Sequence, residues 1–150
     1  MRFLLFDRIT SIEPGKRVTG VKCVNLTDES LRGHFDRRAV VPGSLVIESM
    51  IQLTAWAAIT KHDFVYSVVL SVLEDAQVPS ALTPGHRIDL FGELLGTNPK
   101  GSMARTWAEI DGERIASVGR VIYAHMPVPD PDALRAQYRY LNGPQLELDS

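Results

Sequence analysis

The stretch GHFDRRAVVPGSLVIESMIQLTAWAAI, from Gly33 to Ile59, decides how this chain folds. Nearly every side chain from Leu45 onward is apolar, so the segment has no broad polar face. A helix that is apolar on all sides belongs in a core, and this one is too short to span a bilayer. The pattern therefore predicts a loop that runs into one long buried helix, which the rest of the chain surrounds.

Three polar side chains interrupt the apolar helix. Ser44, Glu48 and Gln52 stand four residues apart, which places them on one stripe of a helix. Desolvation is so costly that a buried carboxyl group is paired or keeps its proton, so a buried Glu48 would donate a proton at neutral pH. The alternative for Glu48 is a structural ion pair with an arginine. Gln52 either orients Glu48 or a bound water, or is satisfied by the neighbouring sheet.

The residues just before the helix indicate a site for negative charge. Pro42 and Gly43 can start the helix, because proline presets φ and glycine lets another group approach the backbone. The free N–H groups of the first turn favour an anion, which makes this turn a candidate oxyanion site. His34, nine residues before Gly43, adds a base that titrates near physiological pH, although a lone loop histidine is more often without a catalytic role.

Taken together, these residues resemble the active-site signature of the hotdog-fold 3-hydroxyacyl-acyl carrier protein dehydratases of fatty-acid synthesis. The signature consists, in this order, of Gly33-His34-Phe35, Val41-Pro42-Gly43, Glu48 and Gln52. Further segments that resemble the family are Phe3-Leu4-Leu5, Asp7-Arg8, Ile12 to Arg17 and Pro84-Gly85. The similarity extends over residues 1–123, and the ordered set is far more specific than any one of its parts.

The resemblance implies a reaction and the residues that perform it. Water would be eliminated from a 3-hydroxyacyl thioester, with His34 removing the proton next to the carbonyl and Glu48 assisting the departing hydroxyl. The Gly43 N–H would stabilise the enolate-like oxygen, and no cofactor is required. Substrate contacts would come from Pro42, Gln52 and Phe35. The resemblance also implies a homodimer in which the histidine of one subunit faces the carboxylate of the other, and it leaves assembly beyond the dimer open.

The remaining pattern predicts an α+β fold, in which an antiparallel sheet of about six strands wraps around the central helix. Segments with a strand pattern are Asp7–Glu13, Arg17–Asn25, Phe64–Leu73, His86–Leu95, Met103–Ile110 and Glu113–Tyr123. The third of these segments is predicted to be buried on both faces, and a loop is predicted from Glu74 to Gly85. Asp111-Gly112 is a strong signal for a two-residue hairpin turn. The resemblance gives this arrangement its name, the hotdog fold.

The chain changes character near its end. Residues 1–126 are expected to form the hotdog dehydratase-like domain, and residues 127–150 a C-terminal extension. Asp130-Pro131 is typical of an N-cap followed by a first helical residue. We therefore expect a short helix through about Tyr140 and a mobile end from Asn142 to Ser150.

Composition excludes several classes of function. With 150 residues and 45% hydrophobic residues, the chain suits one soluble domain with a sizeable core. A net charge of −2 argues against nucleic acid as the main partner, and a single cysteine excludes an internal disulfide framework. No membrane span and no signal-peptide pattern is predicted, which favours the cytoplasm. A metal site has little support, because the histidines are scattered at His34, His62, His86 and His125.

An acyl carrier protein with its phosphopantetheine-linked substrate is the partner that the resemblance implies. Arg32, Arg37 and Arg38, near His34, would guide this acidic protein, although each is equally an ordinary solvated arginine. His62, directly after the central helix, is predicted to cap that helix rather than to act in catalysis.

Two other functions remain open. A hotdog thioesterase would use a helix carboxylate to activate water, but it would not need His34 and the Pro42-Gly43 turn in this order. A non-catalytic acyl-binding subunit of a heterodimer commonly lacks one of the two catalytic residues, whereas both are present here. Departures from the family pattern at Asp36 and Ala39 leave housekeeping fatty-acid synthesis and a specialised acyl or polyene pathway equally open.

Overall fold

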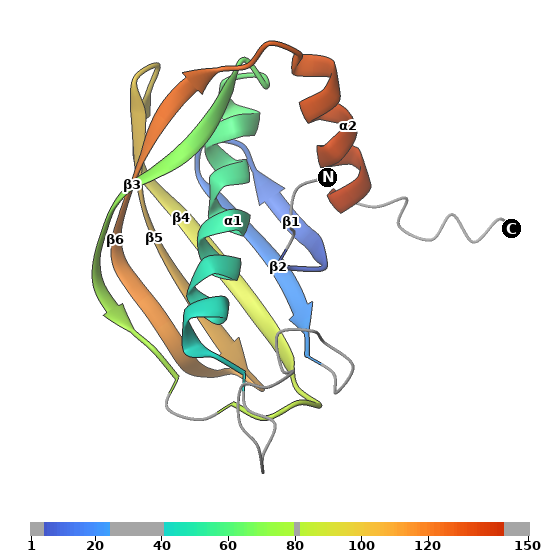
Figure 1. Ribbon diagram of the computed structural model, residues 1–150, viewed down its shortest axis with the longest axis vertical. Helices are drawn as coiled ribbons and strands as arrows, with labels where there is room; N and C mark the ends of the chain where they lie inside the picture. The colour runs from blue at the N-terminus through green and yellow to red at the C-terminus, as the bar shows by residue number, and fades with distance from the viewer. Residues whose placement is uncertain (1–4, 25–40, 80–81, 143–150) are drawn as a thin grey trace, which may run out of the picture.

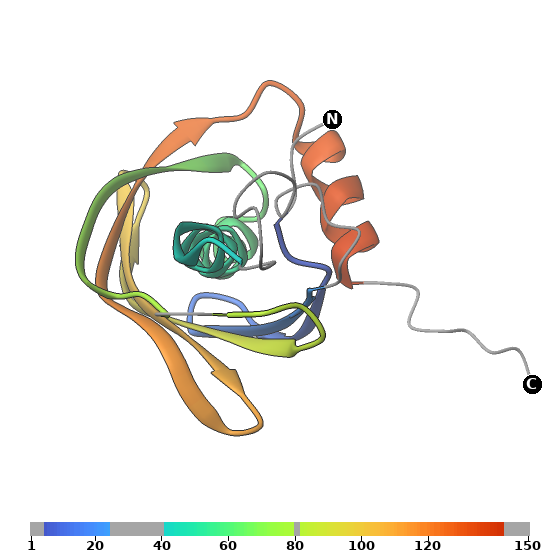
Figure 2. The same ribbon diagram turned by 60° about the horizontal axis from the view of Figure 1, so that its bottom comes forward.

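Helix α1 (Gly43–Lys61) lies in the hollow of a curved antiparallel sheet, with a second helix beside the sheet (Figure 1, Figure 2). The computed structural model describes residues 5–24, 41–79 and 82–142. Across the sheet, the six strands within these residues follow the order β1-β2-β4-β5-β6-β3, and every neighbouring pair is antiparallel. This confirms the expected α+β hotdog arrangement. The remaining elements are β1 (Arg8–Glu13), β2 (Arg17–Cys23), β3 (Tyr66–Gln77), β4 (Arg87–Asn98), β5 (Gly101–Ile110), β6 (Glu113–Pro127) and α2 (Pro131–Asn142).

Two glycines allow α1 to sit close against the sheet. A Cβ atom at Gly92 of β4 would meet the Thr54 side chain, and one at Gly20 of β2 would meet Leu53. Both of these helix residues are fully buried. The Thr54 hydroxyl donates a hydrogen bond to the Met50 carbonyl oxygen at 2.8 Å, so this buried polar group is satisfied. The close approach of helix and sheet therefore depends on the absence of a Cβ atom at Gly20 and at Gly92.

The hairpin turns follow local sequence chemistry. Asp111 and Gly112 have φ angles of 50° and 82°, which are the two left-handed residues of the predicted turn. The turn between β4 and β5 is tighter than expected, because the two strands extend to Asn98 and Gly101. The Asn98 side-chain oxygen closes this turn by accepting hydrogen bonds from the N–H groups of Lys100 at 2.8 Å and Gly101 at 3.2 Å.

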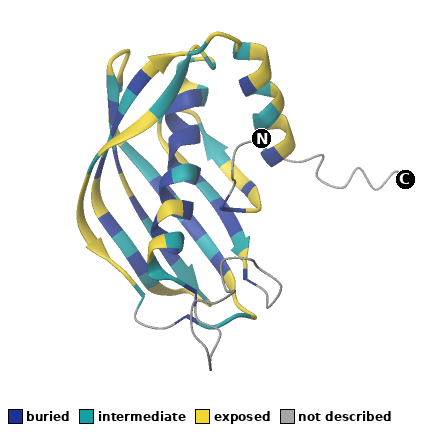
Figure 3. Ribbon diagram, viewed as in Figure 1, coloured by how far each residue is buried: buried dark blue, intermediate teal, exposed yellow. Residues whose placement is uncertain are grey.

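Strand β3 departs from its prediction in both length and burial. It continues to Gln77, beyond the predicted end at Leu73, so part of the predicted loop is strand. Its predicted burial on both faces is wrong, because much of the strand is exposed (Figure 3). Val69 is 52% exposed, Leu70 is 39% exposed and Leu73 is 37% exposed. The reason is its place at the edge of the sheet, where it pairs only with β6. A strand's burial depends on its neighbours in the sheet, and a local pattern does not contain them.

Helix α1 is also not buried on all sides. Ser44 and Glu48 are exposed and Gln52 is half-buried, whereas most of the other side chains from Val46 to Ile59 are buried (Figure 3). The sheet covers the other faces of the helix and leaves this stripe open. The expectation of a buried Glu48 is therefore wrong for the single chain, and within the described residues Glu48 makes no ion pair.

Helix α2 begins where the sequence predicted it. Asp130 Oδ1 accepts a hydrogen bond from the Ala133 N–H at 3.2 Å, and Pro131 is the first residue of the helix. The helix continues to Asn142 and packs beside β1 (Figure 1). The expected mobile end began at Asn142, which is instead the last residue of the helix, and its other residues, 143–150, lie outside the described part of the chain. Among the helices of the described residues, none has the length and apolar character needed to cross a membrane.

Candidate active site

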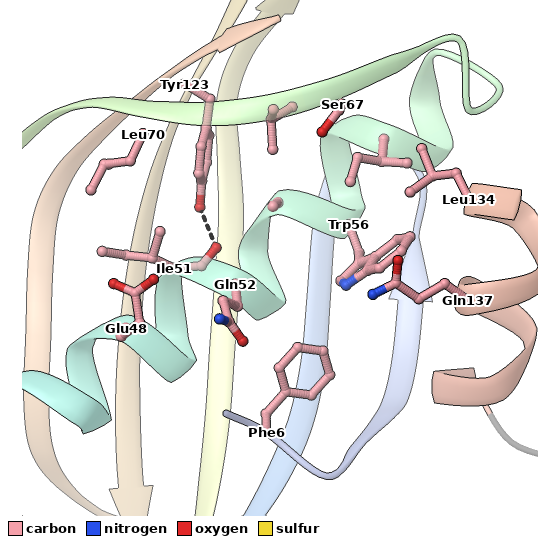
Figure 4. Close-up of a pocket in the computed structure, with 13 residues that line it drawn as sticks. Phe6, Glu48, Ile51, Gln52, Trp56, Ser67, Leu70, Tyr123, Leu134 and Gln137 are labelled. Atoms are coloured by element: carbon pink, nitrogen blue, oxygen red, sulfur yellow. Dashed lines mark hydrogen bonds between the residues drawn. The ribbon is translucent and has the colours of Figure 1, made fainter. Parts of the chain in front are cut away.

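A cavity of about 180 Å³ extends along α1, with β3 and β6 on one side and α2 at one end (Figure 4). Most of its lining is apolar, and Glu48 contributes a carboxylate at the end away from α2. A concave apolar site with a few polar groups is typical of a small-molecule pocket. The lining residues are Phe6, Glu48, Ile51, Gln52, Ala55, Trp56, Ile59, Ser67, Val68, Leu70, Tyr123, Leu134 and Gln137.

Tyr123 stands beside Glu48 in this cavity but is held away from acid–base chemistry. Its hydroxyl donates a hydrogen bond to the Ile51 carbonyl oxygen at 2.6 Å (Figure 4). Burial, and then the negative charge of Glu48, raises the pKa of Tyr123 far above its ordinary value, while an interaction with Thr54 lowers it by less. The hydroxyl therefore stays protonated at neutral pH, and among the described residues that line this end of the cavity Glu48 is the other ionisable group.

Gln52 is engaged by the N-terminal segment of the chain. Its side-chain oxygen accepts a hydrogen bond from the Leu5 N–H at 2.9 Å. The same segment is held by Ser49, whose hydroxyl lies 2.8 Å from the Leu5 carbonyl oxygen and 2.7 Å from the Leu45 carbonyl oxygen. Gln52 therefore has a structural contact that the sequence did not predict, and it still faces the cavity one helical turn after Glu48 (Figure 4).

The start of α1 has the close approach that its glycine predicted. A Cβ atom at Gly43 would collide with the Val78 side chain, so a larger residue at this position would require Val78 to move. The Val41 N–H donates a hydrogen bond to the Leu82 carbonyl oxygen at 2.7 Å, which holds the chain just before the helix. Pro42 is the N-cap residue and supplies no side-chain hydrogen bond. The Leu45 N–H donates a hydrogen bond to the Pro42 carbonyl oxygen at 3.0 Å, and the positive end of the helix dipole lies at Gly43, where it would favour an oxyanion.

The other predicted site residues lie outside the described residues. His34 and Phe35 belong to this group, as do Arg32, Arg37 and Arg38. The structure therefore places Glu48, Gln52 and the Pro42-Gly43 turn along one helix, and the pairing of His34 with Glu48 stays a prediction.

The structure brings together two histidines that are far apart in the sequence. His62 occupies the predicted C-cap position of α1, where its backbone N–H, rather than a charged side chain, bonds to the Ala58 carbonyl oxygen. Its ring centroid lies 5.0 Å from that of His125 on β6. Hydrogen bonds join them through His62 Nε2 to Thr97 Oγ1 at 2.8 Å, Thr97 Oγ1 to Ser102 Oγ at 2.7 Å, and Ser102 Oγ to His125 Nε2 at 2.7 Å. No group of three or more metal-ligating side chains occurs within the described residues.

Burial governs the protonation of this histidine pair. Desolvation lowers the pKa of both groups, and a neighbouring positive charge lowers it further, from Lys61 for His62 and from His62 for His125. The pair lies at the end of α1 opposite to Glu48, so it forms a polar cluster separate from the cavity carboxylate.

Comparison with known proteins assigns the chain to a family. The model of the FabA-like domain matches residues 1–118. The chain belongs to the FabA-like family. Proteins called 3-hydroxyacyl-[acyl-carrier-protein] dehydratase FabZ are similar to it in Caldicellulosiruptor bescii (31% identity, covering 81% of this chain and 87% of that protein), in Enterococcus faecalis (32%, 76% and 82%) and in Bacillus subtilis (31%, 77% and 83%).

Solved structures share the fold of this FabA-like chain at low sequence identity. A Streptococcus mutans UA159 protein bound to acetyl CoA aligns with a TM-score of 0.67 at 12% identity, covering 87% of this chain and 96% of the other. The fluoroacetyl-CoA thioesterase FlK aligns with a TM-score of 0.63 at 15% identity, covering 86% and 98%. These likenesses show the fold alone.

Several cavity residues were not singled out by the sequence. Trp56 and Tyr123 have the pattern of ordinary core residues, and no local signal marks them as part of a cavity. Leu134 and Gln137 carry a weak signal, because residues three apart share a helix face, but the target of that face was not apparent. The FabA-like match ends within β6, so α2 lies beyond the matched residues.

Proposed function

We propose that this protein dehydrates a 3-hydroxyacyl thioester carried on acyl carrier protein to the trans-2-enoyl thioester, with His34 as the base and Glu48 as the acid. The observation that best supports this function is the position of Glu48 at one end of an apolar cavity that extends along α1. An acyl chain in this cavity would place its reacting carbons beside the carboxylate. Membership of the FabA-like family, with FabZ dehydratases among the relatives, favours dehydration over other thioester chemistry.

The proposed reaction uses the residues in complementary roles. His34 takes the proton from the carbon next to the thioester carbonyl, the carbon–oxygen bond at the third carbon breaks, and the hydroxyl leaves as water with a proton from Glu48. Negative charge develops on the thioester oxygen, where the Gly43 N–H at the start of α1 stabilises it. Transfer of a proton from His34 back to Glu48 restores both groups. No electrons are exchanged with another molecule, so the step needs no cofactor.

A homodimer would complete this site. The exposed apolar side chains Val69, Leu70 and Leu73 lie on β3, an edge strand whose free side can pair with another strand. Leu70 lines the same cavity as Glu48, so a second copy on this edge would cover the exposed stripe of α1 and exclude water from it. His34 of the partner subunit would then face Glu48, as the family resemblance implies.

The carrier protein would approach the same end of the site. Arg32, Arg37 and Arg38 precede the start of α1 in the sequence and carry the positive charge that an acidic carrier requires. The ordinary composition of a soluble domain favours the cytoplasm as the place of reaction. Residues 1–126 would form the catalytic domain. Fatty-acid synthesis is the pathway that the named relatives favour.

Subunit mixing tests the proposed function and its geometry together. His34→Ala and Glu48→Gln should each lose about two orders of magnitude or more in dehydration rate, because each removes one partner of the proton transfer. After subunit exchange, a mixed dimer has one site with both defects and one with neither. Equal amounts give about half mixed dimers and hence roughly a quarter of wild-type activity, if the sites act independently. Tagged subunits serve as the control for exchange, and no recovery despite exchange would place both residues in one chain.

The product distinguishes dehydration from thioester hydrolysis. The FlK likeness is at 15% identity and shows the fold alone, so it does not favour a thioesterase for this chain. A dehydratase releases no thiol, whereas a thioesterase releases one thiol for each turnover. Release of thiol from a 3-hydroxyacyl thioester, without formation of the enoyl product, would overturn the proposal.

A further inference from the structure

We propose that α2 forms the end wall of the acyl-chain site and sets the longest straight chain that the protein accepts. This inference rests on the proposed function, because it concerns the substrate of the same cavity. It goes beyond the FabA-like domain, whose match ends at residue 118, before α2 begins.

The cavity ends at residues of α2. Leu134 and Gln137 line it at the end opposite to Glu48, facing Trp56 of α1 (Figure 4). Trp56 and Leu134 are both buried, at 5% and 8% exposure, so packed side chains form this end of the cavity. An acyl chain that enters beside Glu48 and follows α1 would therefore meet α2.

Contacts to the turn after α1 hold this wall in place. The Arg135 guanidinium donates a hydrogen bond to the Asp63 carbonyl oxygen at 3.2 Å and lies 5.4 Å from the centroid of the Phe64 ring. The Tyr138 ring packs 5.4 Å from Phe64 and 5.9 Å from Trp56, measured between centroids. Polar and aromatic contacts thus fix α2 against α1 and the turn that follows it, which makes α2 suited to act as an end wall.

The distance along α1 limits the chain length. The last residues of α1 that line the cavity, Trp56 and Ile59, follow Glu48 by eight and eleven residues, which corresponds to about 12 to 16 Å at the helical rise of about 1.5 Å per residue. An extended chain advances about 1.25 Å per carbon, from a bond of about 1.5 Å and an angle of about 111°, so about nine to thirteen carbons span this distance. The cavity volume of about 180 Å³ is slightly larger than the roughly 150 Å³ that holds one benzene ring. The longest chain that the cavity accepts therefore has at least about six carbons. The site therefore suits a medium-length chain.

Polar side chains at the α2 end of the cavity also limit the length of the acyl chain. The Ser67 hydroxyl and the Gln137 amide line the α2 end of the cavity, and within the described residues neither side chain makes a hydrogen bond. Methylene groups pressed against them would bury polar atoms without partners, which is unfavourable. Chains that reach this end are therefore opposed both by the wall and by its polar atoms.

Substitutions in α2 test the end wall. Leu134→Ala enlarges the end of the cavity, Gln137→Leu keeps its size and removes the polar atoms, and Leu134→Phe shortens it. The ratio of kcat/KM for long over short 3-hydroxyacyl thioesters should rise about tenfold in the first two variants and fall in the third, since each methylene that a pocket admits or excludes changes kcat/KM by about tenfold or more. Tyr140→Ala, on the same helix but 75% exposed, is the control and should keep the original ratio.

Equilibrium binding separates this inference from the proposed function. Calorimetry with saturated straight-chain acyl pantetheine thioesters of graded length measures the same preference without any reaction. If the unsubstituted protein forms no enoyl product, the proposed function fails, and the binding series still decides the role of α2. If folded Gln137→Leu and Leu134→Ala keep the length preference of the unsubstituted protein in both assays, α2 is not the end wall.

Discussion

Acidification below the ordinary histidine pKa of 6.5 should destabilise the fold through His62 and His125. Burial, and then neighbouring positive charge, lowers the pKa of both groups in the folded protein. Between the folded and unfolded pKa values the unfolded chain binds more protons, so the free energy of unfolding falls as the pH falls. The contribution is complete above pH 6.5 and is lost progressively below it, until the folded histidines take up their own protons.

The size of this loss follows from the geometry of the pair. Each histidine contributes at most about 1.4 kcal/mol per pH unit, so the two together contribute at most about 2.7 kcal/mol per unit. Two charges 5.0 Å apart repel by about 3 kcal/mol at an effective dielectric constant near 20, and by about 1 kcal/mol in water. Because His62 is partly exposed, the real repulsion lies between these limits. Because the unfolded histidines are already half protonated at pH 6.5, we expect a loss of at most about 2 kcal/mol over the first pH unit below 6.5.

Urea unfolding at a series of pH values measures this loss. The unsubstituted protein should show a falling free energy of unfolding below pH 6.5, and the double variant His62→Gln with His125→Gln should show a much flatter dependence. His86→Gln is the matched control, because the His86 side chain is exposed. If the free energy of unfolding depended equally on pH in the double variant and the unsubstituted protein, the reasoning would be refuted. It would also be refuted if the pH dependence disappeared in the His86→Gln control.

Two further predictions concern the helix and the cavity. Tyr123→Phe removes the hydroxyl that donates to Ile51, which should cost about 1 kcal/mol in urea unfolding and leave the pH–rate profile of dehydration unchanged, since this hydroxyl stays protonated. Loss of one limb of that profile would mean that Tyr123 takes part in proton transfer. Gly92→Ala should cost about 1 to 3 kcal/mol, because its methyl group meets Thr54, and Thr54→Ala should recover part of this in a double-mutant cycle. Full stability of the Gly92→Ala protein would contradict the close packing of helix and sheet.

Features set by neighbouring residues were predicted correctly from the sequence. The Asp111-Gly112 turn depends on two residues that tolerate positive φ, and the start of α2 depends on an N-cap aspartate followed by proline. The apolar run of α1 depends on its own composition. In each case the deciding interaction lies within a few residues of chain, so the sequence contains its physical cause.

Features set by the order of strands could not be predicted in this way. His62 and His125 are 63 positions apart, and they meet because β6 passes the end of α1 in the folded sheet. Leu134 and Gln137 line the cavity because α2 folds back beside β1, and nothing in the local pattern of α2 names that neighbour. Such contacts depend on topology, which local periodicity does not encode.

The two wrong predictions of burial, for β3 and for Glu48, have a common origin. Both rested on apolar patterns that are typical of covered surfaces, and both fall on the same side of the molecule, since Leu70 and Glu48 line one cavity. The composition of β3 is that of a strand with neighbours on each side, yet in the single chain it pairs only with β6. An apolar edge strand left uncovered promotes association, so a sequence selected for a monomer would carry charged residues there. The misprediction of burial is thus itself an argument for the proposed homodimer.

Leu70→Lys should therefore shift the protein from dimer to monomer in sedimentation and abolish dehydration together with the dimer. Retention of full activity by a monomeric Leu70→Lys protein would show that the site is complete within one chain.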